Sequence, residues 1–326
     1  MQRILVTGAA GFLGSNLVHE LVRLDNEIVG VDDLSSGRME NLGDLNSNPR
    51  FRLLQMDVTT HDWMNEIGGR LDLVVHLAAK KIPRYGGTIG TLKTNYHGAV
   101  NALDLARNHG CKCALASTSD VYGLNPDLPF SEEKSRLVLG SSKSPRWSYA
   151  VSKLFEEHMA LAYQDEYGFP VTLFRFFGAY GPRQQLSWLG GPPPVFIEKV
   201  LKDEAIPIHG DGQQTRSFTF VDDTVAGIVA ACFSERADGE IINIGSNEEV
   251  TILELASKVH RACGKNGEPK LEMIPYESFT GKLYEDVRRR IPDSSLCKVL
   301  LGVEATTSLD DGLALTVAWQ REEMGF

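Results

Sequence analysis

The stretch ILVTGAAGFLG, residues 4–14, joins a short apolar run to a turn that contains Gly8, Gly11 and Gly14. The spacing G-x-x-G-x-x-G between a strand and a helix is typical of a turn that holds a pyrophosphate. Gly8 permits the tight turn, Gly11 lets a phosphate approach the helix N-terminus, and Gly14 permits close packing of helix on strand. The sequence therefore predicts a dinucleotide site with these candidate contacts: Gly8, Gly11, Phe12, Leu13 and Gly14.

Apolar runs and helical patterns alternate outward from this turn. The runs predict strands at residues 4–6, 28–31, 51–56, 73–77, 113–116 and 171–174. Apolar residues at helical spacing predict helices at residues 13–21, 99–107 and 149–163. Strands separated by helices form parallel sheets, and strands without polar alternation are covered on both faces. We therefore expect an α/β fold built on a doubly wound parallel sheet of the Rossmann type.

The second half of the chain is less regular and predicts a smaller, mixed C-terminal domain. Three successive prolines in residues 190–194 predict a loop, because proline breaks helices and central strands. Thr251 and Glu254 have the spacing of a capping box at a helix start. Helices are expected at residues 195–201, 222–233 and 251–263, and a strand at residues 241–244. We expect a dinucleotide-binding domain of residues 1–176 with 218–247, and a substrate-binding domain of residues 177–217 and 248–326.

Composition excludes several classes of protein. The chain has 326 residues and a formal net charge of −10 at pH 7, which disfavours binding to a nucleic-acid backbone. No run reaches the roughly 18 apolar residues of a membrane span, and the N-terminus lacks a signal-peptide pattern. Five scattered cysteines indicate reduced thiols in the cytoplasm. Cys111 and Cys113 alternate in an apolar run, which favours buried strand positions over metal ligands, so no metal is expected.

Acidic residues at two strand ends indicate which dinucleotide binds. Asp32 ends the second predicted strand, where a carboxylate can accept hydrogen bonds from both hydroxyls of an adenosine ribose. It would repel a ribose 2′-phosphate, which favours NAD as the cofactor, while Arg38 keeps NADP as an alternative. Asp57 ends the third strand and is placed either to meet the adenine amino group or to cap the loop.

Tyr149 and Lys153 stand four residues apart, on one face of a predicted helix. A cation about 4 Å from the phenol, at an effective dielectric near 20, contributes roughly 4 kcal/mol. We therefore expect Lys153 to lower the pKa of Tyr149 by about three units and to make the phenol a base near neutral pH. Thr118, just after the fifth strand, lies at the sheet edge where ligands bind and can share a substrate hydroxyl with Tyr149.

The order of these motifs resembles that of the extended short-chain dehydrogenase/reductase family, the NAD-dependent nucleotide-sugar epimerases, dehydratases and decarboxylases. The resemblance extends over nearly the whole chain. It is carried by TGAAGFLG at 7–14, HLAA at 76–79, Asn95 with Gly98, STSDVYG at 117–123, YAVSK at 149–153, RFFGAYGPR at 175–183, GDGQQTRSF at 210–218 and NIGS at 243–246.

The resemblance implies that Tyr149 takes the proton of the sugar 4-hydroxyl with help from Thr118, while NAD receives the C4 hydride. A 4-keto sugar forms, and the same hydride returns. Lys81 and Asn95 match positions around the nicotinamide ribose. Further cofactor contacts are implied at Val58, Leu77, Ala78 and Ala79.

The family also implies the substrate contacts. Arg216 matches an arginine on the sugar-nucleotide diphosphate, and Arg290 is the first candidate within the cluster of Arg288, Arg289 and Arg290. Ser119 stands where some dehydratases carry an acidic residue, which disfavours that branch. Gly178 stands where many members carry asparagine, so we expect free space and one hydrogen bond fewer at the sugar.

The net reaction depends on Asp120. Simple 4-epimerases need no carboxylate there, whereas some dehydratases and UDP-glucuronate decarboxylases place glutamate at this position. The leading interpretation is a 4-epimerase of a UDP-hexose or UDP-hexuronate, with a UDP-glucuronate decarboxylase as the close alternative. A nucleotide-sugar dehydratase and a non-catalytic NAD-binding sensor remain further alternatives. As in relatives, helices near residues 97–109 and 149–166 are expected to pair in a homodimer.

Other residues could face the sugar or the base. Trp188 is expected either to stack on the ligand or to fill the core of the small domain. Lys80, Arg84 and Tyr85 follow the fourth strand, and basic side chains there would suit a sugar that bears a carboxylate.

Overall fold

The computed structural model describes residues 1–81, 87–276, 278 and 285–326, and its main element is a parallel sheet of seven strands. The spatial order is β11-β6-β5-β4-β1-β2-β3, and each neighbouring pair is parallel. The strands are β1 (Arg3–Thr7), β2 (Glu27–Asp32), β3 (Phe51–Gln55), β4 (Leu73–His76), β5 (Lys112–Thr118), β6 (Val171–Phe176) and β11 (Ile241–Ile244). All seven strand positions were expected from the apolar runs, and the doubly wound fold is confirmed.

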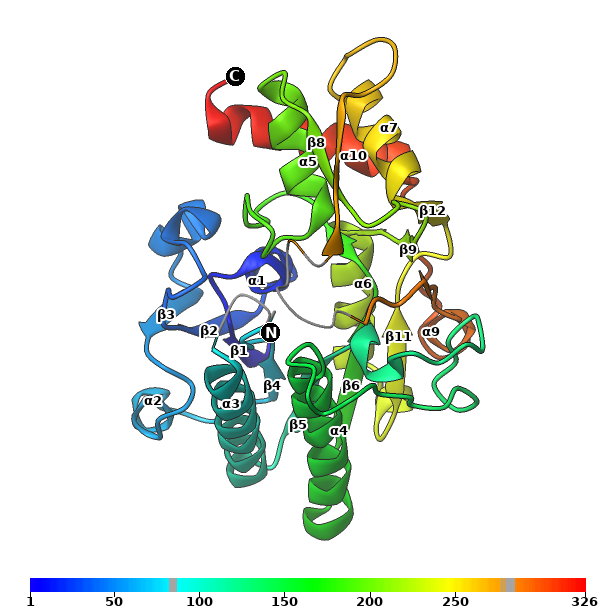
Figure 1. Ribbon diagram of the computed structural model, residues 1–326. Helices are drawn as coiled ribbons and strands as arrows, with labels where there is room; N and C mark the ends of the chain where they lie inside the picture. The colour runs from blue at the N-terminus through cyan, green and yellow to red at the C-terminus, as the bar shows by residue number, and fades with distance from the viewer. Residues whose placement is uncertain (82–86, 277, 279–284) are drawn as a thin grey trace.

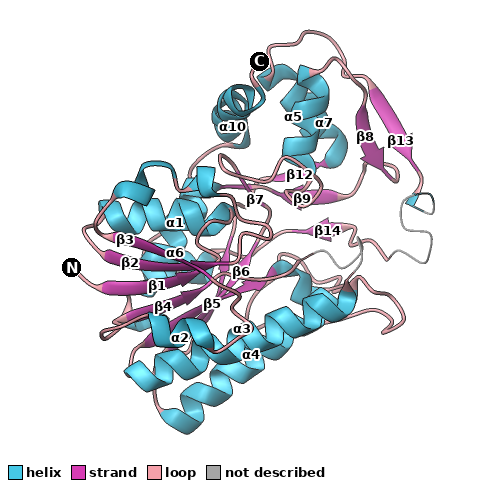
Figure 2. Cartoon of the chain, turned by 90° about the vertical axis from the view of Figure 1, so that its left-hand side faces the viewer, coloured by secondary structure: helices cyan, strands magenta, loops and turns pink. Residues whose placement is uncertain are grey.

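Helices cover both faces of this sheet (Figure 2). One face carries α1 (Phe12–Arg23) and α6 (Val221–Cys232), and the other carries α2 (Asp62–Glu66), α3 (Thr88–His109) and α4 (Trp147–Tyr167). Side chains alternate between the faces, since Ile4 and Val6 pack in one buried cluster and Leu5 packs in the other. Burial on both sides explains why the strands are apolar without polar alternation.

A smaller part of the chain lies beyond the carboxyl ends of the strands (Figures 1 and 2). Its helices are α5 (Pro192–Leu201), α7 (Ile252–Ala262) and α10 (Leu309–Met324). The short helix α9 (Ser295–Leu301) instead packs on β11 and α6 of the larger part. Its short strands are β7 (Ala179–Tyr180) with β10 (Thr219–Phe220), β8 (Ile206–His209) with β13 (Leu271–Ile274), and β9 (Thr215–Ser217) between β12 (Glu249–Thr251) and β14 (Arg289–Arg290). The 3₁₀ helices include η1 (Met39–Asn41), η2 (Gly43–Ser47), η4 (Ser119–Tyr122) and η5 (Glu235–Ala237).

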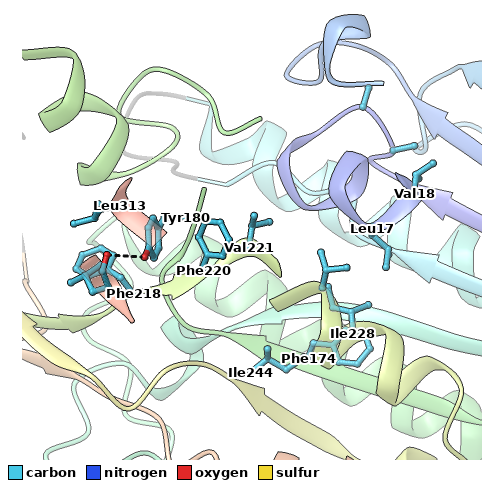
Figure 3. Close-up of a cluster of buried hydrophobic side chains, with 14 of the residues drawn as sticks. Leu17, Val18, Phe174, Tyr180, Phe218, Phe220, Val221, Ile228, Ile244 and Leu313 are labelled. Atoms are coloured by element: carbon cyan, nitrogen blue, oxygen red, sulfur yellow. Dashed lines mark hydrogen bonds between the residues drawn. The ribbon is translucent and has the colours of Figure 1, made fainter. Parts of the chain in front are cut away.

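One apolar core joins the two parts. Figure 3 shows Leu17 and Val18 of α1 near Ile228 of α6, and the same buried cluster continues to Tyr180 and Leu313 in the smaller part. The packing of α1 on α6 and of α10 on β10 makes the cluster continuous. The two parts therefore share buried surface, which fixes the edge of the sheet against the smaller part.

The prediction of a loop at residues 190–194 was wrong for residues 192–194, which are helical. Pro192, Pro193 and Pro194 form the first turn of α5, with Gly191 as the N-cap at φ 90°. The first N–H groups of a helix have no acceptor within the helix, so proline loses nothing at these positions. The capping box of Thr251 and Glu254 is confirmed at the start of α7.

The topology supports a division of the chain into two domains. The seven strands of the large sheet come from residues 3–176 and 241–244, and the strands of the short sheets come from other segments. We therefore propose one domain of residues 1–176 with 218–247 and a second of residues 177–217 and 248–326. No helix among the described residues has the length and apolarity needed to cross a membrane.

Candidate active site

The glycine turn between β1 and α1 leaves no room for side chains. Gly8 has φ +70°, and a Cβ there would lie 2.9 Å from the backbone nitrogen of Ala78. A Cβ on Gly14 would lie 1.9 Å from the carbonyl oxygen of Gly8. Gly11 is the N-cap of α1, and as a glycine it has no side chain that could accept hydrogen bonds from the first N–H groups of the helix. The backbone N–H groups of Phe12 and Leu13 therefore open the helix toward this turn, which fits a pyrophosphate.

Asp32 lies at the carboxyl end of β2, beside the same turn. Its Oδ2 accepts a hydrogen bond from the Ala10 N–H at 2.9 Å, and its Oδ1 accepts one from the Leu34 N–H at 2.8 Å. Burial raises the pKa of Asp32, and these backbone hydrogen bonds oppose the rise. The Gly11 N–H also bonds to this carboxylate and opposes the rise. A carboxylate has about four acceptor sites, so Asp32 can still accept a hydrogen bond from a ribose hydroxyl.

Two further predicted cofactor residues lie nearby. Asp57 is exposed, and its Oδ1 accepts a hydrogen bond from the Thr59 N–H at 2.8 Å, which is the loop-capping role that the sequence left open. Val58 is buried, and its carbonyl accepts hydrogen bonds from Asn101 and Trp63. Arg38 pairs with Glu323 of α10 at 2.8 Å.

The segment after β4 is held against the glycine turn. The Ala78 N–H donates to Thr7 Oγ1 at 3.2 Å, and Leu77 and Ala79 flank it, half-buried. Asn95 of α3 is fully buried, with its Oδ1 accepting from the Lys80 N–H and its Nδ2 donating to Ser152 Oγ. Asn95 thus ties this segment to α4. Lys81 is exposed, next to residues that lie outside the described part.

Thr118 and Tyr149 meet at the carboxyl end of β5. Burial raises the pKa of Tyr149, the negative charges of Asp120 and Glu156 raise it further, and a hydrogen bond from Thr118 opposes the rise. The expected lowering of this pKa by Lys153 was therefore wrong. Sequence spacing showed the lysine but not the two carboxylates that fold close to the phenol.

The charge of Lys153 is matched within α4 itself. Its Nζ lies 2.9 Å from Oε2 of Glu156, and the two side chains are 1% and 2% exposed. The neighbouring Glu157 faces another way and accepts hydrogen bonds from Arg175 at 2.9 and 2.6 Å. Glu156 is a site residue that sequence reasoning missed, although its position seven residues after Tyr149 places it on the same helix face.

Arg290 is the member of the arginine cluster that reaches this strand end. Its Nη2 lies 2.8 Å from Oδ1 of Asp120, and its Nη1 donates to Ser119 Oγ at 3.4 Å. Arg288 and Arg289 instead form exposed ion pairs with Asp211 and Glu249. Since Ser119 and Asp120 directly follow Thr118, the guanidinium of Arg290 lies at the strand end that carries Thr118.

A second group of charges links Asp120 to Arg216. Arg216 Nη2 lies 3.0 Å from Oδ1 of Asp286, and Arg146 Nη1 lies 3.6 Å from the same oxygen. Arg146 Nη2 also lies 3.7 Å from Oδ1 of Asp120. These arginines hold the pKa of Asp286 below its usual range, although burial alone would raise it. Sequence reasoning missed Arg146 and Asp286; the place of Arg146 three residues before Tyr149 was the available signal for the arginine.

Gly178 does not leave free space. It has φ +53°, and a Cβ there would lie 2.1 Å from the carbonyl oxygen of Ser217. The expectation of room for the sugar was wrong, because the backbone of β9 fills the position of the missing side chain.

The remaining sequence candidates are placed as follows. Trp188 stacks on the His209 ring at 4.5 Å and meets Phe196 of the core edge-on at 6.4 Å. Lys80 is exposed, and Arg84 and Tyr85 lie outside the described residues. Among the described residues, no group of three or more His, Cys, Asp or Glu side chains is arranged to hold a metal ion. Cys111 and Cys113 are buried free thiols.

Known proteins share both the sequence and this architecture. A curated relative, the UDP-N-acetyl-alpha-D-glucosaminuronate decarboxylase of Bacillus cytotoxicus, is 36% identical over 98% of this chain and 98% of its own length. The solved UDP-glucose 4-epimerase of Thermotoga maritima with UDP-glucose is 31% identical, with TM-score 0.87 over 99% of both chains. The UDP-glucuronic acid 4-epimerase of Bacillus cereus, solved with UDP-glucuronic acid and NAD, is 29% identical, with TM-score 0.85 over 98% of this chain and 99% of its own.

The family profile agrees with these likenesses. The NAD dependent epimerase/dehydratase family matches residues 4–245, which include the glycine turn, Thr118, Tyr149 and Lys153. The glycine turn and the fixed Asp32 carboxylate fit a dinucleotide on physical grounds as well. This chain belongs to the NAD-dependent epimerase/dehydratase family and uses NAD as its cofactor.

Proposed function

We propose that this protein oxidises C4 of a UDP-hexuronate and then releases the sugar carboxylate as CO2. The observation that carries the proposal is the contact of Arg290 with Asp120 at 2.8 Å, two residues beyond Thr118. The carboxylate of a hexuronate lies on C5, next to the C4 that Tyr149 and Thr118 address. A guanidinium at this place suits an anionic sugar, whereas a neutral hexose would offer it no charged partner.

Arg146 supports the same substrate class from the other side of Asp120. It begins α4 as the N-cap residue, and its side chain lies between the carboxylates of Asp120 and Asp286. Its guanidinium also stacks on the ring of Trp147 at 4.8 Å, which fixes its plane. With Arg216 at the far end of the same group, the site can bind a diphosphate and a sugar carboxylate together.

The proposed reaction begins with proton removal by Tyr149. Bound NAD supplies the hydride acceptor, and its oxidised ring carries a positive charge that favours the phenolate. Tyr149 takes the proton of the 4-hydroxyl, to which Thr118 also hydrogen-bonds, as C4 loses its hydride. The product is a 4-keto hexuronate, in which the carboxylate on C5 is β to the ketone.

A β-keto carboxylate loses CO2 when its C5–C6 bond breaks, because the electron pair passes to the C4 oxygen as an enolate. A proton from solvent would then add at C5, bound NAD would supply the hydride that reduces C4, and Tyr149 would give its proton back to the C4 oxygen. The likeness to a decarboxylase over 98% of the chain supports this outcome.

The second candidate is 4-epimerisation of the same UDP-hexuronate, the leading interpretation of the sequence. The likeness to a UDP-glucuronic acid 4-epimerase, with TM-score 0.85, favours it. In that reaction the ketone turns over before the hydride returns, and Arg290 with Arg146 would hold the carboxylate in place. Both candidates use Tyr149, Thr118 and Lys153 in the same roles.

Product analysis separates the candidates. The purified protein is incubated with NAD and, in turn, UDP-glucuronate, UDP-N-acetylglucosaminuronate, UDP-glucose and TDP-glucose, and the products are followed by mass spectrometry and NMR. A UDP-pentose, lighter by one CO2, supports the proposal. A UDP-hexuronate of unchanged mass with inverted C4 establishes the epimerase, and loss of water establishes a dehydratase. Binding of NAD without turnover of any sugar contradicts all three and leaves the sensor.

A further inference from the structure

Glu156 is a buried carboxylate in contact with the lysine of the predicted catalytic pair. Tyr149, Lys153 and Glu156 occupy successive turns of one face of α4. Lys153 Nζ and Glu156 Oε2 are 2.9 Å apart, and neither side chain is more than 2% exposed. Among the described residues, the other carboxylate oxygen, Oε1, is buried without a hydrogen-bond partner.

Burial of a carboxylate oxygen without a hydrogen-bond partner costs free energy of folding. Replacement of both members of a buried ion pair by apolar side chains of similar volume often stabilises a protein. Burial raises the pKa of Glu156 to about 7, Lys153 opposes the rise, and the charge of Glu157 adds to it. Stability therefore does not explain the Lys153–Glu156 pair as a whole, and the reason for Glu156 lies in the buried ammonium of Lys153 that it balances.

The groups around Glu156 make Lys153 its principal partner. On β4, His76 bonds to Thr7 Oγ1 through Nδ1, and burial together with Lys153 lowers its pKa to about 3, so it is neutral. On β6, Arg175 is engaged by Glu157, whose Oε1 also accepts from Ser117 of β5. On α3, Asn95 bonds to Ser152. On η4, Asp120 is held by Arg290 and Arg146.

We propose that Glu156 is a positioning residue that holds the Lys153 ammonium through one of its three N–H groups. The other two N–H groups of Lys153 then point toward the nicotinamide ribose and Tyr149. An ammonium has three donors on a flexible stem, and a fixed buried acceptor removes much of that freedom. The negative charge of Glu156 also favours the protonated form of Tyr149, so the phenol holds the proton it takes from the sugar until the hydride returns. This role rests on the proposed chemistry of Tyr149 but not on the identity of the sugar.

The test compares E156Q, which keeps the shape and removes the charge, with the wild type between pH 5.5 and 8.5, a range chosen to bracket neutrality. Protonation of Glu156 breaks the ion pair, so kcat of the wild type should fall about tenfold as the pH drops through about 7. E156Q should show the lower value at every pH, without this step. The dissociation constant of NAD, measured by calorimetry without any sugar, should rise by a similar factor under the same conditions.

Two controls share the helix. E166Q makes the same change at an exposed glutamate of α4 and should match the wild type. Because histidines in general change charge near neutral pH, H158Q at an exposed histidine of α4 should keep the step. E156D keeps the charge on a shorter side chain, so its kcat should still fall near pH 7 but from a lower value at high pH. If E156Q does not fold, E156D is the variant to compare with the wild type.

The inference is overturned if E156Q keeps the wild-type kcat at pH 8 and still loses activity near pH 7. It is also overturned if the kcat of E156D at high pH equals that of the wild type. Failure of the proposed function looks different. In that case the wild type turns over no UDP-hexuronate, while the NAD titration of E156Q against the wild type still decides the role of Glu156.

Discussion

At the scale of single residues, the phenol of Tyr149 carries the chemistry, so Y149F should lower kcat by about 10²- to 10⁴-fold. The change removes one oxygen from a packed ring and leaves Lys153 and the glycine turn in place, so NAD affinity and the melting temperature should stay near those of the wild type. Y167F, on an exposed tyrosine of the same helix, is the matched control for kcat. Substantial turnover by Y149F would assign the base to another group.

Arg290 should decide which sugars are accepted. R290K keeps a positive charge but loses the planar fork that contacts Asp120 and Ser119. We expect kcat/KM for a UDP-hexuronate to fall about 10- to 100-fold, whereas any activity on UDP-glucose stays within about twofold. R289K, at an exposed arginine paired with Glu249, should change neither value. Equal losses on both sugars would show that Arg290 does not read the carboxylate.

The sequence was sufficient to predict those site residues whose position follows from the local pattern of helices and strands. Tyr149, Lys153 and Thr118 lie on a helix face and a strand end that the pattern of apolar residues already locates. Asp286 and Arg146 were missed because their role depends on partners far away in the chain, as in the contact of Asp286 with Arg216. The direction of the Tyr149 pKa was wrong because its main cause, the burial of the phenol, cannot be seen in the local spacing of Tyr149 and Lys153.

At the scale of elements, the turn between β6 and β7 should tolerate little change. G178N introduces the asparagine that the family resemblance implies at this position, yet its Cβ would meet the Ser217 carbonyl at 2.1 Å. We expect the free energy of unfolding to fall by about 1–3 kcal/mol, measured by chemical denaturation. G110N has a similar φ, +61°, and no atom within 4 Å of its Cβ, so it separates the clash from the backbone effect. Equal losses in both variants would contradict the clash.

Elements with a strong local pattern were predictable, and short ones were not. Buried parallel strands such as β1 and β5 are continuous apolar runs, and the capping box marks α7. Two-residue strands such as β7 and β14 exist only through pairing with distant segments. The start of α5 was misread because three prolines suit the first turn of a helix as well as a loop.

At the scale of the whole molecule, α3 and α4 lie side by side (Figure 1). Both helices expose apolar side chains. Ile89 is 70% exposed, Val151 and Phe155 are each 46% exposed, and the Tyr96 ring contacts that of Phe155. We propose that these helices pair across a two-fold axis in a homodimer. Light scattering should give twice the chain mass of 35.9 kDa.

Substitution at the proposed interface gives the sharper test. F155E places a charge on the apolar face and should yield a monomer at micromolar concentration. L315E, at an apolar side chain of α10 that is 53% exposed, should remain a dimer. A wild-type protein that scatters as a monomer would refute the pairing.

The last strand of the large sheet has a consequence for biosynthesis. β11 borders β6 on its outer side but begins only at Ile241, after the excursion through α5 and α6. A nascent chain that has emerged up to residue 176 therefore contains the whole glycine turn but leaves the outer edge of β6 unpaired, and such an edge can pair with other chains. Ribosome stalling or proteolytic cleavage inside that excursion would release a fragment prone to aggregation and dependent on chaperones, rather than a functional half-enzyme.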